Sequence, residues 1–150
     1  MKVSRNWAFA LAMPVLMLLA SHVFAQADQK PIFSGYKGVM IGMPMSDARS
    51  KLGSARDKSD QEDYYVYNDK ENCQVLYGND KTVRVISVTY LGKDAPTPKE
   101  ILGVDAEVMP EGGINKRVEY PKAGYSVSYL KTKGDDPMVI VTVQKMMVAQ

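Results

Sequence analysis

The chain has 150 residues and carries 19 lysines and arginines against 17 aspartates and glutamates, a formal charge of +2. It contains one histidine (His22), one tryptophan (Trp7) and one cysteine (Cys73). Beyond residue 25 no histidine remains, which excludes Ser-His-Asp and Cys-His catalytic centres as well as the Cys and His clusters that bind zinc. A nearly neutral chain also has no net attraction to nucleic acid.

The first 25 residues have the pattern of a secretory signal. A basic start is followed by an apolar run over residues 7–19, which is shorter than the about 20 residues that a membrane-spanning helix needs. Small residues then offer two cleavage sites, after Ala25 or after Ala27. No cysteine lies near either site for lipid attachment. We therefore expect a periplasmic or secreted protein that is soluble and keeps no transmembrane segment after cleavage.

Removal of this signal leaves 17 basic residues against 17 acidic ones and takes away the histidine and the tryptophan. We predict a mobile leader over residues 26–36, followed by a single α+β domain over residues 37–150. The domain is predicted to consist of two repeats, at about 37–95 and 96–147. Cys73 has no partner for an internal disulfide and is expected to be buried as a small apolar residue.

Two short helices are predicted about fifty residues apart. In residues 43–53, Pro44 suits the first helical turn, and the apolar residues that follow lie on one side at helical spacing. In residues 97–103, Thr97 and Glu100 form a capping-box pattern. Both segments end in Leu-Gly, and glycine favours the left-handed conformation that ends a helix.

Three strand-like runs follow each helix, joined by connectors short enough for antiparallel hairpins. The sequence therefore predicts two tandem αβββ units that form one antiparallel sheet with the short helices packed on one face. The predicted strands cover residues 63–68, 72–77, 82–91, 116–120, 125–131 and 138–145.

The alternation of apolar and polar residues predicts which side chains face the core. In the second half, Leu130 and Ile140 break an otherwise regular alternation. In the first half, a change of phase near Val85 and Ile86 predicts a bulge or a strand buried on both faces. Residues expected to face the core are Tyr64, Val66, Cys73, Val75, Tyr77, Val118, Tyr120, Tyr125, Val127, Tyr129, Val139, Val141 and Val143. Residues expected on the outer face are Tyr65, Tyr67 and Leu76.

An Ile41-Gly42-Met43 start, a helix ending in Leu52-Gly53 and a strand with Tyr65 and Tyr67 follow one another along the chain. This order resembles the SmpA/OmlA-type (BamE-like) small outer-membrane assembly lipoproteins, and the doubled unit is similar to the β-lactamase-inhibitor proteins. The chain departs from the first family in three ways: it has no lipid-bearing cysteine, Ser54 stands where a proline is common, and the aromatic strand has no tryptophan. The resemblance implies an envelope protein that binds other proteins.

Candidate chemical groups receive a simpler interpretation. The acidic cluster of Asp57, Asp60, Glu62 and Asp63 is interleaved with basic residues and is expected to be a solvated connector. Methionines 40, 43 and 45 are expected to fill the core. We expect no cofactor, no metal and no catalysis.

Outward tyrosines beside a leucine would form an apolar contact patch, so Tyr65, Tyr67 and Leu76 are the predicted protein-binding surface. The leading hypothesis is an exported adaptor that binds an envelope or secreted protein. The alternatives are an inhibitor of a secreted or envelope enzyme and, in another class, a hydrolase that uses carboxylates or Cys73. The oligomeric state is left open.

Overall fold

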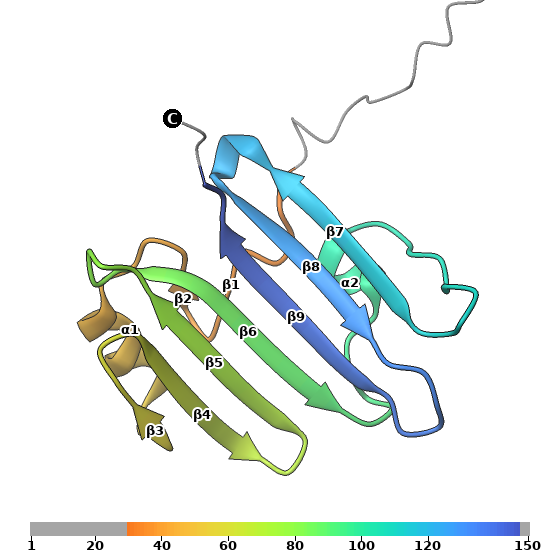
Figure 1. Ribbon diagram of the computed structural model, residues 1–150, viewed down its shortest axis with the longest axis horizontal. Helices are drawn as coiled ribbons and strands as arrows, with labels where there is room; N and C mark the ends of the chain where they lie inside the picture. The colour runs from red at the N-terminus through yellow and green to blue at the C-terminus, as the bar shows by residue number, and fades with distance from the viewer. Residues whose placement is uncertain (1–29, 148–150) are drawn as a thin grey trace, which may run out of the picture.

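Seven strands form one antiparallel sheet in the order β3-β4-β5-β6-β9-β8-β7 (Figure 1). The structure is a computed structural model that describes residues 30–147, so the predicted export signal and residues 26–29 of the predicted leader lie outside it. The strands are β3 (Asp57–Lys58), β4 (Glu62–Asn68), β5 (Glu71–Tyr77), β6 (Val83–Leu91), β7 (Ile114–Tyr120), β8 (Tyr125–Lys131) and β9 (Met138–Lys145).

The helices and a small hairpin lie on one face of this sheet, which we call the inner face (Figure 1). These helices are α1 (Met45–Leu52) and α2 (Pro98–Leu102), and a single 3-10 turn, η1 (Pro121–Ala123), lies in the connection between β7 and β8. The hairpin consists of β1 (Gly35–Tyr36) and β2 (Val39–Met40). The opposite side of the sheet is the outer face. The prediction of an α+β fold with one antiparallel sheet and short helices is confirmed.

Strands β4, β5 and β6 follow α1 and lie side by side, and β7, β8 and β9 follow α2 and do the same. The two groups of strands meet at the centre of the sheet, where β6 pairs antiparallel with β9 and Val88 lies opposite Val141. The last strand of each group is therefore central. The first strand of each group is the farthest from the centre, and only the short β3 lies beyond β4. The two hairpin turns of each group lie at opposite ends of its strands (Figure 1).

Helix α2 begins as its sequence predicts. The Thr97 hydroxyl accepts a bond from the Glu100 amide, and the Glu100 carboxylate accepts one from the Thr97 amide at 2.7 Å. These bonds satisfy two amides that the first turn of a helix leaves without partners. Gly103 ends the helix in the left-handed conformation with φ of 74°. A helix of this length depends on such caps and on packing, because its own propensity is insufficient.

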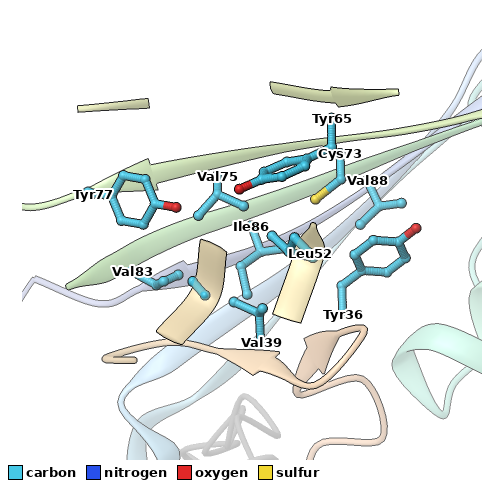
Figure 2. Packing of buried hydrophobic residues seen from close by; sticks show 11 residues of the cluster. Tyr36, Val39, Leu52, Tyr65, Cys73, Val75, Tyr77, Val83, Ile86 and Val88 are labelled. Carbon is cyan, nitrogen blue, oxygen red and sulfur yellow. The ribbon is translucent and has the colours of Figure 1, made fainter. Parts of the chain in front are cut away.

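The core consists of two clusters of buried side chains, one beneath each helix. Figure 2 shows the first, in which Val39 and Leu52 pack against side chains from β4, β5 and β6. Phe33, Ile41 and Tyr90 contact both clusters and thereby connect them. Tyr36 is also buried, so packed structure extends into the segment that the sequence assigned to the leader.

The predicted orientation of strand β4 is wrong. Tyr65 is 1 % exposed and belongs to the core, whereas Val66 is 43 % exposed. Tyr67 is half-buried and packs on the same core cluster. The reason is that Asp63, a charged residue, is fully buried on the inner face, and successive side chains of a strand alternate between faces. The sequence analysis placed Asp63 in a solvated connector, and this is wrong because Asp63 is buried. With Asp63 on the inner face, Tyr65 and Tyr67 lie on the inner face as well.

The change of phase predicted in β6 is confirmed. Leu76 pairs with Val85 and Tyr77 pairs with Val83, so Arg84 is an extra residue in β6. Such a bulge moves the following side chains to the other face. As a result Val83 and Ile86 both face the core, although three positions separate them.

Candidate functional site

The outer face of the sheet presents side chains in three rows that run across the strands. The cross-strand register from β4 to β7 defines each row. The middle row is Tyr64, Gln74, Ser87, Thr142, Ser128 and Arg117. The rows on either side of it are Val66, Asn72, Thr89, Ile140, Leu130 and Asn115, and Glu62, Leu76, Val85, Gln144, Ser126 and Glu119.

Most apolar residues of this face lie in neighbouring pairs, whereas Val66 lies opposite Asn72. Leu76 lies opposite Val85, and Ile140 lies opposite Leu130. Beyond the rows, Leu91 lies opposite Met138, which is two positions from Ile140 on the same strand. The paired apolar side chains therefore form two groups, one near each end of the central strands.

Hydroxyl and amide side chains separate these two groups, and the Ser87 and Thr142 hydroxyls are 3.0 Å apart in a hydrogen bond. Within the three rows, charged side chains occur only on the peripheral strands β4 and β7: Glu62, Arg117 and Glu119. The centre of the outer face is thus uncharged. No helix or strand of residues 30–147 covers it (Figure 1).

Of the three residues predicted to form the binding surface, the structure places only Leu76 on the outer face. Tyr65 and Tyr67 lie together on the inner face with parallel rings whose centres are 6.3 Å apart. The Tyr67 hydroxyl donates to the Leu52 carbonyl oxygen at 3.4 Å, so this ring helps to hold α1. Sequence reasoning missed Val85 as an outer-face residue, and the predicted change of phase beside it was the signal that could have placed it there.

A buried ion pair joins helix α1 to the sheet beneath it. The Arg49 guanidinium donates two hydrogen bonds to the Asp63 carboxylate, each of 2.8 Å, and a third of 2.6 Å to the Ser59 carbonyl oxygen. The hydroxyls of Tyr77 and Tyr65 donate to the same carboxylate at 2.7 and 3.2 Å. Asp63 therefore has partners for both of its oxygens despite complete burial.

These contacts determine the pKa values of the cluster. Burial by itself would raise the pKa of Asp63, but the hydrogen bonds from the guanidinium and the two hydroxyls outweigh it and hold the pKa below its usual range. Burial and the neighbouring Asp63 charge raise the pKa of Tyr65 to about 12 and raise that of Tyr77 as well. The carboxylate is thus held ionised and the tyrosines neutral, which suits a structural ion pair better than a proton-transfer centre.

A second polar cluster lies where the β1–β2 hairpin meets the sheet. The Tyr36 hydroxyl donates to the Glu71 carboxylate, and the Tyr36 and Tyr67 rings are 5.9 Å apart. The Lys37 ammonium lies 4.3 Å from the centre of the Tyr67 ring, within the range of a cation–π contact. Lys37 and Gly38 both have positive φ, as the two-residue turn of such a hairpin requires.

A shallow groove of about 640 Å³ opens beside Tyr90, where the two core clusters meet. Its walls include three carboxylates, Glu71, Asp94 and Glu100. Glu71 accepts the Tyr36 hydroxyl, Glu100 caps helix α2, and Asp94 forms an ion pair of 3.6 Å with Lys70. All three carboxylates therefore have partners within the fold.

The other catalytic candidates have equally plain surroundings. Cys73 is completely buried, and burial raises the pKa of its thiol to about 12, so the reactive thiolate does not form at neutral pH. In the described part of the chain, no three acidic, histidine or cysteine side chains are grouped as a metal site. Among residues 30–147 there is also no helix with the length and apolar character needed to cross a membrane.

Comparison of the chain with models of known protein families, with curated proteins and with solved structures found no match.

Proposed function

We propose that the chain is an exported, non-catalytic binding protein whose outer sheet face contacts another protein in the bacterial envelope. The observation that supports this proposal most directly is the difference between the two faces of the sheet. The inner face is covered by α1, α2 and the β1–β2 hairpin, whereas the described residues leave the outer face bare. A bare face with grouped apolar side chains is typical of a surface that contacts another protein.

The chemistry of this face favours a neutral protein partner. Leu76 with Val85, and Ile140 with Leu130, supply apolar area, and the hydroxyls between them supply hydrogen-bonding groups. Protein interfaces combine an apolar centre with few charges and a polar rim. The charged residues of the outer face lie at its two edges, so their place agrees with such a rim.

We further propose that the two halves are tandem αβββ units, as the resemblance to the SmpA/OmlA-type and β-lactamase-inhibitor proteins implies. In each half one helix precedes three long adjacent strands, which supports this, although the first half adds the two-residue strand β3. The same doubled order favours a second candidate function, inhibition of a secreted or envelope enzyme. In that case the outer face would occupy the cleft of the enzyme.

Site-specific crosslinking tests the contact surface. A photoreactive amino acid is placed at Leu76 or at Ile140 on the outer face, and in a matched control at Val108, a loop residue that is 67 % exposed. Crosslinking is carried out in cells that export the chain. We expect one protein to be captured from both outer-face positions and not from residue 108. Different proteins at the two positions, or the same protein from residue 108, would contradict the proposal.

Binding of the purified captured protein then provides the quantitative test. Val85→Glu introduces a charge into the apolar pair with Leu76 and is expected to weaken binding at least about tenfold. Val108→Glu is the control with the same chemical change outside the sheet. Activity assays of lysozymes and β-lactamases in the presence of the chain separate the two functions. Inhibition that Val85→Glu abolishes would indicate an enzyme inhibitor. Enzymes that remain fully active would rule out the inhibitor function for the enzymes tested.

A further inference from the structure

The two peripheral strands of the sheet differ in how far they are paired. At one edge, β3 pairs with Asp63 and Tyr64 of β4, and the register of β4 shifts between Val66 and Asn68. At the other edge, β7 pairs with β8 along its whole length without a shift, and no described strand pairs with its outer side. An unpaired, regular edge strand can accept a further strand through its free backbone groups.

The side chains of β7 determine which strand can be added. Asn115, Arg117 and Glu119 lie on the outer face, and Arg117 and Glu119 form an exposed ion pair of 3.3 Å within the strand. On the inner side, Val118 is buried and Lys116 is half-buried. The outer face of the strand therefore carries a positive charge at Arg117 and a negative charge at Glu119. Val118, the residue between them in sequence, is uncharged and lies on the inner face.

We propose that a second copy of the chain adds to this edge, with the two β7 strands antiparallel and Val118 opposite Val118. In this register Arg117 of each copy lies opposite Glu119 of the other, so the two-fold arrangement makes two attractive charge pairs. Lys116 lies opposite Tyr120, which is uncharged. Directly opposite residues of antiparallel strands are close enough for such pairs to stabilise the contact.

Other antiparallel registers of the two β7 strands also keep the inner faces of both copies on the same side of the sheet. These registers place like charges opposite one another. A register centred on Arg117 places two arginines opposite one another, and one centred on Glu119 does the same with two glutamates. A register centred on Lys116 places two lysines opposite one another. Because a shift by one residue would place outer side chains opposite inner ones, the Val118-centred register is the one that the charges of β7 favour.

The extent of the pairing follows from what lies next to β7. Pro121 begins η1 directly after the strand and has no amide hydrogen to donate. The Val118-centred pairing therefore covers residues 116–120 of each copy. One short strand pair is a small contact, so the dimer is expected to dissociate on dilution, and to weaken at high salt because its charge pairs are exposed.

Charge reversal provides the test, with the full mature chain in sedimentation velocity over a concentration series at low and high salt. Arg117→Glu gives each copy two acidic residues at the pairing positions, and Glu119→Arg gives each copy two basic ones. Each variant alone is expected to weaken dimerisation about tenfold or more. Arg84→Glu changes an exposed arginine on β6 in the same way and is expected to leave dimerisation unchanged.

The two variants mixed in equal amounts are the decisive measurement, because every opposed pair in the mixed dimer is then arginine with glutamate. We expect the mixture to form a heterodimer at concentrations at which each variant alone is monomeric. The double variant Arg117→Glu/Glu119→Arg should dimerise with itself as the original chain does. A monomer at every concentration, a dimer that Glu119→Arg leaves intact, or a mixture that stays monomeric would overturn the proposal.

Discussion

Arg49 and Asp63 are joined by two hydrogen bonds of 2.8 Å that connect helix α1 to strand β4. Asp63 is fully buried, whereas the Arg49 side chain is 26 % exposed at the edge of the helix. Breaking a buried pair on one side leaves a charge without compensation, which costs far more than the loss of an exposed pair. The pair therefore ties the orientation of α1 to the phase of β4.

Replacement of Arg49 by methionine should lower the free energy of unfolding by about 3 kcal/mol, because it leaves the buried Asp63 carboxylate without its cation. Chemical denaturation measures this change. Arg56→Met is the control, since Arg56 is exposed on the following loop, and it should change the free energy of unfolding by less than about 0.5 kcal/mol. Equal effects of the two substitutions would contradict a structural role for the pair.

Stability should also decrease in acid. The folded state lowers the pKa of Asp63, so the unfolded chain takes up a proton first as the pH falls. The contribution of Asp63 is therefore complete above the usual aspartate pKa of about 3.9 and is lost as the pH falls through the lower pKa of the folded state. Denaturation curves at several acidic pH values should show a shallower pH dependence for Asp63→Asn than for the original chain. Parallel dependences would argue against this assignment.

The thiol of Cys73 should be protected while the protein is folded. Burial covers it and raises its pKa to about 12, so both access and ionisation are suppressed. A thiol reagent should label the native chain slowly and the denatured chain at the rate of free cysteine. Denaturant below the unfolding transition should accelerate labelling in proportion to local opening. Rapid labelling of the folded chain would show that the strand is accessible.

Gly35 should tolerate no larger residue. A Cβ atom at this position would lie 2.0 Å from the Val39 carbonyl oxygen, a backbone atom that cannot move without displacing the hairpin. Gly35→Ala is expected to destabilise the fold by about 1–3 kcal/mol in thermal or chemical denaturation. Gly78→Ala is a useful comparison, because its Cβ would meet only the side chains of Arg84 and Asp80 at 2.6 Å, and these can rotate away. The second substitution should therefore cost clearly less.

The sequence predicted the order and approximate limits of the main elements because turn chemistry and periodicity act locally. The capping box at Thr97 and the hairpin connectors are examples, and strands β8 and β9 have the predicted bounds. The three two-residue strands were missed, since two residues carry no periodicity. Their pairing depends on contacts with β4 and with the core, which a local pattern does not contain.

The candidate site was predicted less well because the phase of β4 depends on a long-range contact. Tyrosines at positions 64, 65 and 67 can serve either face, and valine at position 66 favours the core by hydrophobicity alone. Asp63, Tyr65 and Tyr67 share the inner face, so the phase of the strand is evident only once Asp63 is known to be buried. Its cation lies 14 residues earlier on a helix, and only the packed structure brings the two together.

The central pairing of β6 with β9 has a consequence for the order in which the chain is made. Strand β5 pairs with one side of β6 and precedes it in the chain, whereas β9, which pairs with the other side from Val85 with Gln144 to Leu91 with Met138, comes about fifty residues later. While a ribosome is still synthesising the second half, β6 is therefore an open edge with apolar side chains on both sides. A nascent or truncated chain that ends before β9 would be prone to aggregate, and a factor that holds it unfolded until synthesis is complete would prevent this.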